Sequence, residues 1–573
     1  MAALATPTLR AAQRLALATG LAALPFELEA GLPLGPLTLT NVELLLLGAL
    51  GLWALVLVRE RQAPDLPAWL LIGAAALLGA LLLSAVLAEA GRAGALKFAL
   101  RQAQGALLAL CLADTLRRGA GAALYAGALL AGAGASAALG LVEMSEAPAA
   151  LALLDPFKAE ATYMGGLLRL SGTFSYANTA AQYFEAVLPL AVLAAVGLGA
   201  ARRPWPMAAG AALAALLLLA TLLTYSRAAL AVAAALLALS PLVARRAFGA
   251  AAARRALALC AGLAAVGLAL AAASPTFRLR VSEPEVARWY GARYAPSAVG
   301  PLAPNELREV PVAVENSGRL AWRPDGPRPV RLAYHWLDAR TGAVVRYEGR
   351  RTPLPHPVAP GETVTLTATV QAPARPGRYV LAWDMVREQT GRGWFSQMGV
   401  PPARVAVEVA GAPAPAPPPS ADPPQAPRAI APIPGPPGRR ELWGAAIAMW
   451  RERPIVGVGP DVFRHTYGPR LGLQVWDDRV HTNNLYLELL AGAGVVGLLA
   501  FLALAGATLR AGWGGLAAPP RPPAETALLA GALLGVAAFL GHGLLDVFLA
   551  FTPTYALLWA MVGAVGGLAP RRA

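Results

Sequence analysis

Long apolar runs, separated by short stretches rich in Arg, Pro or Gly, form the dominant pattern along this chain. Each run has roughly 20 residues, the length that a helix needs to cross about 30 Å of hydrocarbon. The pattern predicts twelve spans, at 12–29, 41–58, 67–87, 98–114, 121–142, 178–200, 206–224, 227–244, 256–274, 484–509, 525–545 and 549–568. The first run lacks a convincing cleavage site and is interrupted at Pro25, so it is predicted to be a span and not a signal peptide.

The basic residues of the short loops predict the orientation of these spans. One set of alternate loops carries most of them and is assigned to the cytoplasm by the positive-inside rule. This set contains Arg10, Arg14, Arg59, Arg61, Arg117, Arg118, Arg202, Arg203, Arg245, Arg246, Arg254, Arg255, Arg510, Arg521, Arg571 and Arg572. The formal net charge of +15 is therefore attributed to topology and to contact with anionic membrane lipids, not to nucleic-acid binding.

The opposite loops contain few cations, and these need another explanation. They are Arg92, Lys97, Arg101, Lys158, Arg169 and Arg227. Any chemistry of the chain is expected on this non-cytoplasmic side. Both cysteines, Cys111 and Cys260, fall in predicted spans, so the external part can form no disulfide of its own.

Residues 275–483 interrupt the membrane pattern and are predicted to lie outside, because nine spans precede them. Within this block, 306–410 alternates short strand-like stretches with turn signals, which predicts a β-sandwich. The stretches are 310–315, 330–337, 344–347, 363–370, 379–383 and 405–409. With Trp322, Trp336 and Trp383, this segment resembles the immunoglobulin-like or fibronectin-like modules of bacterial surface enzymes. It would either bind glycan or cell wall or act as a spacer whose tryptophans are core.

The rest of the chain falls into further segments around this predicted module. Residues 1–274 carry the first nine spans, 275–305 form an external connector, 411–438 form a Pro/Ala-rich linker, 439–483 form an external segment, and 484–573 carry the last three spans. In the external segment, 441–453 has helical spacing with Trp443, Ala446, Ile447 and Trp450 apolar, which predicts an amphipathic helix at the outer membrane surface. The fold class is an all-α polytopic membrane bundle of about twelve helices with an inserted extracytoplasmic β-sandwich.

Three polar clusters interrupt the apolar pattern, all on the predicted external side. The first reads Arg-Leu-Ser-Gly-Thr-Phe-Ser-Tyr-Ala-Asn from Arg169 to Asn178, and the second reads Thr-Tyr-Ser-Arg and ends in Ser226 and Arg227. The third begins with Pro-Ile-Val-Gly-Val-Gly-Pro at 454–460. It continues through Phe463, His481, Asn483, Asn484 and Glu488 to Gly494 and Gly497.

In order, spacing and sidedness, these clusters resemble those of the O-antigen ligase and O-antigen polymerase superfamily of membrane glycosyltransferases. The resemblance covers most of the membrane part and none of the β-rich insert. Members show an Arg…Gly-Thr-Phe…Asn loop, a Ser-Arg turn, a Pro-x-x-Gly-x-Gly…Phe segment, and a His-Asn pair followed by Gly-x-x-Gly. Two positions depart from that pattern: Asn483-Asn484 replaces the His-Asn pair, with His481 two residues earlier, and Gly492 stands where members often have Glu.

The resemblance implies transfer of a glycan from a polyprenyl (undecaprenyl) diphosphate carrier to an acceptor hydroxyl, outside the cytoplasmic membrane of a bacterium. Arg169 and Arg227 are expected to hold the diphosphate, because a guanidinium grips phosphate oxygens bidentately. Lys97 and Arg101 could extend this anion site, and the alternative for all four cations is interfacial snorkelling. Asn178 and Ser226 are candidates for binding substrate.

A histidine near these cations is the expected base, since its pKa near ~6.5 suits it to accept a hydroxyl proton. His481 is the first candidate, with a helix-capping role as the alternative, and His465 is the second. Asn483 and Asn484 are expected to orient sugar or to cap the tenth span. His542 and Asp546 form a polar lining or pair without an assigned role, and His335 and His356 in the insert are expected to be structural.

No metal-ligand spacing and no nucleotide-binding loop occurs in the sequence, so neither a metal nor a cofactor is expected. The acceptor can be lipid A core, another glycan or a protein, and the enzyme can be a ligase or a polymerase. The rival interpretation is a transporter or flippase for a lipid-linked glycan. Transporters, however, place charges or broken helices at the midplane, whereas here the polar residues gather at one face. A purely structural envelope protein is the third possibility.

Overall fold

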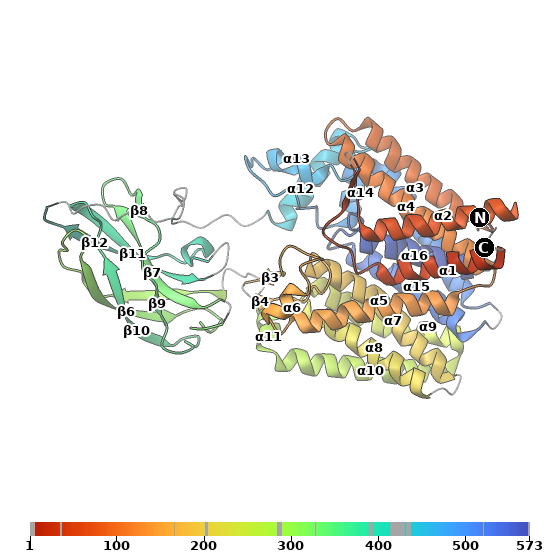
Figure 1. Cartoon of the computed structure of the whole chain (residues 1–573), viewed down its shortest axis with the longest axis horizontal. Coiled ribbons are helices and arrows are strands. Elements are labelled where there is room, and N and C mark those ends of the chain that lie inside the picture. Colours follow the sequence, from red (N-terminus) through yellow and green to blue (C-terminus); the bar gives the residue numbers. More distant parts are fainter. Residues whose placement is uncertain are drawn as a thin grey trace. The chain divides into compact units, whose positions relative to one another are not determined.

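The computed structural model describes residues 6–34, 37–165, 167–200, 204–283, 289–326, 328–388, 393–412, 430, 437–518 and 521–570. The chain divides into two compact units (Figure 1). The first contains 1–162, 168–274 and 436–573 and is helical, and the second contains 163–167 and 275–435 and holds the larger sheets. Most of the predicted linker at 411–438 lies outside the described residues.

Helices make up the first unit. They are α1 (Thr6–Ala23), α2 (Asn41–Glu60), α3 (Ala68–Leu87), α4 (Arg92–Arg117), α5 (Ala122–Glu143), α6 (Pro148–Ala152), α7 (Ala177–Ala200), α8 (Pro204–Leu223), α9 (Arg227–Phe248), α10 (Ala250–Ala273), α12 (Arg439–Glu452), α13 (Phe463–Arg470), α14 (Leu485–Gly515), α15 (Pro523–His542) and α16 (Thr552–Leu568). A short hairpin, β1 (Leu32–Leu34) with β2 (Leu37–Leu39), connects α1 to α2.

Nine helices of the described chain are long and apolar enough to cross a membrane: α2, α3, α5, α7, α8, α9, α10, α14 and α15. Helix α16 is apolar but has only 17 residues. Helices α1 and α4 coincide with predicted spans but fall outside these nine, so the structure supports a multi-pass membrane protein without fixing the total at twelve. The first helix also ends at Ala23, earlier than expected, because Pro25 disfavours helical backbone for the residue before it.

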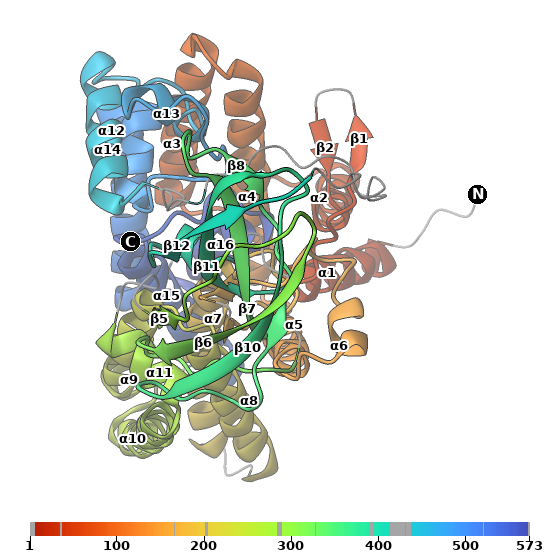
Figure 2. The ribbon, with the colours of Figure 1, turned by 90° about the vertical axis from the view of Figure 1, so that its left-hand side faces the viewer.

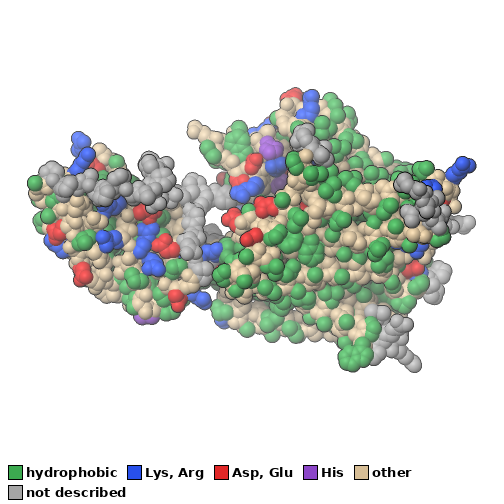
Figure 3. Space-filling view, viewed as in Figure 1, with side chains coloured by type: hydrophobic (Ala, Val, Ile, Leu, Met, Phe, Trp, Pro, Cys, Tyr) green, Lys and Arg blue, Asp and Glu red, His purple; other side chains and the backbone are tan. Residues whose placement is uncertain are grey.

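The surface of the helical unit is largely apolar. Leucine, isoleucine and valine side chains that point away from the core cover much of it, as Figure 3 shows. Charged side chains gather instead at the end of the unit where α12 and α13 lie. A helix that keeps apolar residues on its outward face is expected to meet lipid there, because the bilayer core offers no partners for polar groups. Helices α7 and α16 are exceptions, since α7 is buried among α8, α9 and α15, and all residues of α16 are buried.

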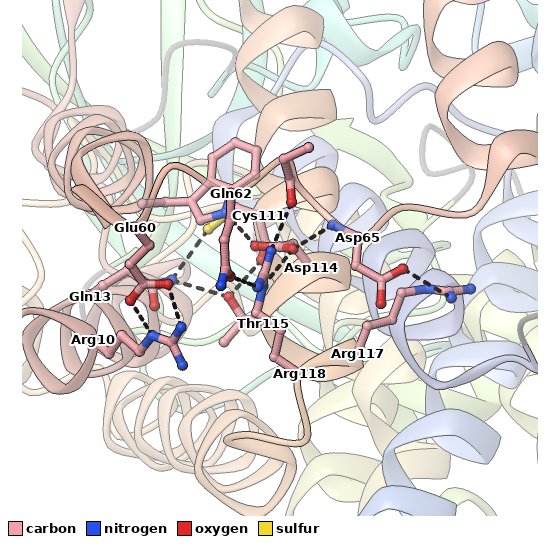
Figure 4. Close-up of polar contacts among 12 residues, drawn as sticks. Arg10, Gln13, Glu60, Gln62, Asp65, Cys111, Asp114, Thr115, Arg117 and Arg118 are labelled. Atoms are coloured by element: carbon pink, nitrogen blue, oxygen red, sulfur yellow. Dashed lines mark hydrogen bonds and ion pairs between the residues drawn. The ribbon is translucent and has the colours of Figure 1, made fainter. Parts of the chain in front are cut away.

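A polar network joins the ends of α1, α2 and α4 on the predicted cytoplasmic side (Figure 4). Its centre is the carboxylate of Asp114, which is 2% exposed. This carboxylate accepts hydrogen bonds from the backbone N–H of Asp65 at 2.7 Å and from Nε of Arg118 at 2.9 Å. Arg10 pairs with Glu60 beside it. Two of the loop arginines that predict the orientation, Arg10 and Arg118, therefore also connect helix ends.

Two antiparallel sheets sharing one apolar core make up the second unit (Figure 2). One sheet has the order β10 (Thr363–Gln371), β6 (Leu307–Asn316), β5 (Ala292–Pro296). The other has the order β12 (Ala403–Val409), β11 (Gly377–Arg387), β7 (Val330–Asp338), β8 (Val344–Arg346), with β9 (Thr352–Pro353) also on β7. The two-residue strands β3 (Tyr163–Met164) and β4 (Leu167–Leu168) form a hairpin at 163–168. Each of the six predicted strand stretches overlaps one of the six strands β6, β7, β8, β10, β11 and β12, because period-two patterning places alternate side chains in the core.

The predicted connector at 275–305 is itself structured. It contains α11 (Pro275–Ser282) and the strand β5, which pairs with β6 along its whole length. Trp289, just before β5, is fully buried in the core shared by the two sheets. The sandwich therefore begins before residue 306, where the sequence pattern placed its start.

The tryptophans of the insert are core residues. Trp322, Trp336 and Trp383 are each 0% exposed, so none of them can stack on a glycan at the surface. Of the two interpretations of this module, the structure thus removes the evidence for tryptophan-mediated glycan binding. His335 is also buried and lies 3.5 Å from Asp384, whereas His356 is exposed near Glu362.

Candidate active site

The loop that carries the first polar cluster is anchored by a buried ion pair. Lys158 donates from Nζ to Glu143 at 2.5 Å, and both side chains are almost completely buried. The other carboxylate oxygen of Glu143 accepts the backbone N–H groups of Ser171 at 3.0 Å and Gly172 at 2.7 Å. Lys158, one of the external cations left unexplained by topology, therefore has a structural role next to the Gly-Thr-Phe motif.

Arg169 connects three separate segments of the helical unit. Its Nε donates to the carbonyl oxygen of Thr224 at 2.7 Å, and one terminal nitrogen donates to Oδ1 of Asn178 at 2.6 Å. The amide of Asn178 in turn donates to Asp546 at 2.7 Å. Asn178, predicted to bind substrate, links Arg169 to the loop after α15, and these contacts fix the direction of the guanidinium.

The Ser-Arg turn at the start of α9 follows directly after Thr224, whose carbonyl accepts from Arg169. Ser226 is buried and caps α9 by accepting the backbone N–H of Ala229 at 3.4 Å, so its hydroxyl serves the helix terminus. Arg227 is the first residue of α9 and is exposed. It has no hydrogen bond or ion pair with another described residue. Since Thr224 accepts from Arg169, the two arginines belong to one corner of the bundle.

A break in α14 explains the Pro-x-x-Gly-x-Gly motif. Gly494 has φ 65° and ψ −170° inside α14, which interrupts the helical hydrogen bonds. The motif supplies the missing partners, because the N–H groups of Val458 and Gly459 donate to the carbonyls of Ala491 and Gly492, each at 2.9 Å. The N–H of Val495 donates to the carbonyl of Pro454 at 2.9 Å. Broken backbone within a membrane protein persists where protein groups satisfy it in this way.

Only glycine allows this approach of two backbones. A Cβ at Gly457, where φ is 71°, would lie 2.4 Å from the carbonyl carbon of Gly492, and a Cβ at Gly494 would lie 2.1 Å from the carbonyl oxygen of Ile455. At Gly492 itself an added Cβ would meet Pro460 at 3.0 Å. The position where members of the superfamily often have Glu is thus closely packed here.

His481 forms a dyad with the carboxylate of Glu488, a residue that was not predicted from the sequence to be functional. Its Nδ1 lies 3.3 Å from Oε1 of Glu488, and the side chains are 11% and 9% exposed. The second oxygen of Glu488 accepts the backbone N–H of Thr482 at 3.0 Å. Burial alone would lower the pKa of His481, but the hydrogen bond and the charge of Glu488 outweigh it and raise the pKa above its ordinary value.

The two asparagines after His481 differ in their roles. Asn484 caps α14, because its Oδ1 accepts the N–H groups of Tyr486 and Leu487, each at 3.0 Å, which matches the capping alternative. Asn483 has left-handed backbone with φ 52°, a conformation that Asn tolerates better than most residues. Its half-buried side chain forms no hydrogen bond to another described residue, so it is the asparagine left to contact a ligand.

The remaining predicted cations surround a second ion pair. Arg464 donates to both oxygens of Asp461, at 2.8 and 2.9 Å, and the charges of this pair act on Lys97 and on His481. Arg101 is paired with the buried carboxylate of Glu43 at 2.7 Å. Lys97 is half-buried. Arg101 therefore has a structural partner, whereas Lys97 remains a candidate for the anion site.

His465 is less suited than His481 to act as a base. It lies 3.9 Å from Asp478 and is 34% exposed on its side chain. Burial, followed by the charge of Arg464, lowers the pKa of His465. It has no buried carboxylate to orient the ring, in contrast to His481.

The 543–551 loop brings the clusters to one end of the helical unit. Asp546 accepts from Asn178, and the carbonyls of Leu544 and Gly543 accept from Asn484 and from the N–H of residue 485, at 3.0 and 2.7 Å. The ring of Phe551 lies 6.4 Å from that of His481 and 5.7 Å from that of Tyr176. The arginine loop and the histidine segment thus meet the same loop, although sequence places them 300 residues apart.

Two further features differ from expectation. Helix α12 buries Leu442, Ala445, Ala446 and Met449 against its neighbours α13 and α14, while Trp443, Ile447 and Trp450 are half-buried. The helix is therefore packed on protein through a face adjacent to the one expected to meet lipid. His542 and Asp546 do not pair, since His542 lies 2.6 Å from Glu185 of α7 and both are fully buried.

One comparison with known proteins matches part of this region. Residues 434–502 match the family model described as O-antigen ligase. No curated protein matches the chain. The matched range contains α12, the Pro-x-x-Gly-x-Gly segment, His481 and the break at Gly494. The match confirms, for this segment of the chain, the resemblance to the O-antigen ligase superfamily seen in the sequence.

Proposed function

We propose that the protein is an O-antigen ligase-like glycosyltransferase that moves a glycan from a polyprenyl diphosphate carrier to an acceptor hydroxyl. The observation that carries this proposal is the His481–Glu488 dyad in the segment that matches O-antigen ligases, meeting the same loop as Arg169. A base and a pair of arginines are the groups that the reaction needs. One accepts the proton of the acceptor, and the others stabilise the diphosphate as it leaves.

The proposed step balances as a displacement at the anomeric carbon. The acceptor oxygen forms a bond to that carbon while its proton passes to Nε2 of His481. The bond from carbon to the diphosphate oxygen breaks, and the electron pair stays on the diphosphate. Arg227, whose guanidinium is exposed, would bind that anion directly, with Arg169 beside it. Glu488 would stabilise the imidazolium that forms.

The setting of the reaction follows from the topology. We infer that the motif loops face the outside of a bacterial cytoplasmic membrane, because the short loops opposite to them carry most of the basic residues of the short loops. We propose that the two-sheet unit is an immunoglobulin-like spacer on the same side. The acceptor would be lipid A core, another glycan or a protein, and polymerisation of the glycan is the alternative outcome of the same chemistry.

Reconstitution of the purified chain with a lipid-linked oligosaccharide tests the proposal. A glycosyltransferase releases free polyprenyl diphosphate, whereas a transporter moves the donor without cleaving it. Arg227→Lys keeps the positive charge but loses the planar guanidinium that can donate two hydrogen bonds to phosphate oxygens. Turnover should therefore fall at least about tenfold. Arg254→Lys, an exposed arginine of a predicted cytoplasmic loop, is the matched control and should retain full turnover. Intact donor in every reconstitution would exclude the proposed reaction.

A further inference from the structure

A cavity of about 220 Å³ lies in the helical unit beside the Gly-Thr-Phe-Ser motif. Its wall combines the carboxylates Glu27 and Glu29 with the hydroxyl-bearing residues Thr40, Thr173, Ser175 and Thr179. These residues come from the α1–α2 connection, the loop before α7 and the first turn of α7. Typical small-molecule pockets measure about 300–1,000 Å³, so this cavity suits a single ring and not a chain of several.

Glu27 is a carboxylate of this wall that is bonded to hydroxyls and to no cation of the described residues. Within the described residues it forms no ion pair, and the nearest cation, Arg101, is bonded to Glu43 at 2.7 Å. Burial raises the pKa of Glu27, while the hydroxyls of Thr552 and Thr40 and the charge of Arg101 oppose the rise. A carboxyl held in a cavity in this way has hydrogen-bonding capacity left for a ligand.

The chemistry of the wall excludes some ligands and favours another. Two carboxylates disfavour an anion, so the diphosphate of a lipid carrier is excluded from this cavity. An apolar ligand would give the carboxyl of Glu27 no hydrogen bond beyond those from the hydroxyls of Thr40 and Thr552, at a cost in affinity. A neutral ring that carries several hydroxyls satisfies the carboxyls and hydroxyls together, and the ring of Phe551 offers it an apolar surface.

Phe551 also connects this cavity to the proposed base. Its ring contacts the cavity and lies 6.4 Å from the ring of His481. We propose that the cavity is a subsite for one hydroxyl-rich pyranose unit and that Glu27 accepts hydrogen bonds from its hydroxyls. The identity of this unit as part of a transferred or receiving glycan rests on the proposed function, whereas binding of the sugar itself does not.

Direct binding to the full-length chain in lipid nanodiscs tests the subsite without turnover. The probes are free methyl hexopyranosides, detected by saturation-transfer NMR. The wild type should give a signal, and Glu27→Leu should weaken binding at least about tenfold, as expected for loss of a charge-assisted hydrogen bond. Glu160→Gln, an exposed carboxylate of the same external region that lies outside the cavity wall, is the matched control. Equal binding by Glu27→Leu and the wild type would overturn the proposal, as would no signal from any hexopyranoside.

Two competition experiments distinguish failure of this proposal from failure of the proposed function. Displacement of the probe by a lipid-linked oligosaccharide would identify the unit as part of the donor, and displacement by a free acceptor oligosaccharide would identify it as part of the acceptor. Displacement by neither would overturn the assignment of the bound unit to the donor or the acceptor glycan, while binding of the sugar through Glu27 would still stand. Ser175→Ala, at an exposed position of the wall, provides a second variant in case Glu27→Leu does not fold. A chain that binds the probe through Glu27 but never releases polyprenyl diphosphate would refute the transfer reaction and leave the subsite standing.

Discussion

Replacing Glu488 by Gln tests whether its carboxylate makes His481 a base. The variant keeps the size of the side chain and an acceptor for the N–H of Thr482, which lies 3.0 Å away in the native chain. It removes the charge that faces Nδ1 of His481 at 3.3 Å. The amide cannot stabilise an imidazolium as a carboxylate does, so proton transfer from the acceptor should become slower.

The size of the effect follows from the distance and the burial of the pair. Two unit charges about 4 Å apart interact by about 4 kcal/mol at an effective dielectric constant of about 20. Each 1.36 kcal/mol of transition-state stabilisation corresponds to about tenfold in rate. Glu488→Gln should therefore lower turnover by up to about 10³-fold. His481→Ala should lie in the range of about 10²–10⁴-fold that general base catalysis contributes.

The pH dependence separates a catalytic dyad from a structural contact. A base acts in its neutral form, so activity is lost as the pH falls through the pKa of His481, which Glu488 raises. Removing that charge lowers the pKa, and the acid limb of the pH–rate profile should move to lower pH while the plateau falls. Asp478→Asn, beside His465 at 3.9 Å, is the control and should leave the limb in place.

The assay follows the release of polyprenyl diphosphate from a lipid-linked oligosaccharide. It gives kcat/KM in a series of buffers from about pH 5 to about pH 9. The double variant His481→Ala/Glu488→Gln should be no slower than His481→Ala, because residues that act as one unit are not additive. A reduced plateau with an unmoved acid limb would show that Glu488 only holds the fold. Full activity in His481→Ala together with loss in His465→Ala would show that the base is assigned to the wrong histidine.

Three other predictions follow from the same structure. Gly457→Ala should abolish turnover and reduce the amount of folded protein recovered in detergent, because the added Cβ meets the carbonyl carbon of Gly492 at 2.4 Å, whereas Gly444→Ala, in open space on α12, should be tolerated in the same expression assay. Turnover should survive a chelator; loss restored by Mg²⁺ or Mn²⁺ would contradict the expected metal independence. Residues 289–412 expressed alone should melt cooperatively by circular dichroism, whereas 300–410, which lacks Trp289 and β5, should be markedly less stable, and equal melting of both would show that β5 is dispensable.

The strongest sequence predictions were those that depended on periodicity. Alternation in β10 buries Val364, Leu366, Ala368 and Val370, so the strand could be located from the pattern alone. The apolar runs located most of the helices in the same way. β5 was missed because Arg293 and Pro296 interrupt its pattern, and only pairing with β6 defines it as a strand.

The partners of the site residues could not be predicted, because they depend on contacts between distant segments. Glu143 is the last residue of α5, and in the sequence it looks like an ordinary polar residue at a helix end. Its carboxylate nevertheless accepts the backbone N–H groups of Ser171 and Gly172. The sequence analysis named Glu488 only as part of a motif. Its spacing of seven residues from His481 indicates a contact only when the start of α14 between the two residues is known. Asn178 was assigned to substrate because its link to Asp546 spans 368 positions.

Residues 434–502, which match the O-antigen ligase family model, contain both sides of the α14 break. The break at Gly494 needs backbone partners, and 454–459 supplies them from within the same matched segment. His481 and its carboxylate lie between these two parts, and Asn484 and residue 485 between them also contact the 543–551 loop. The arginine loop is held from outside this segment, by Glu143, by the carbonyl of Thr224 and, through Asn178, by Asp546. A site assembled in this way can keep a recognisable histidine segment while the rest of the bundle diverges, provided that Arg169, Arg227 and the loop after α15 are retained.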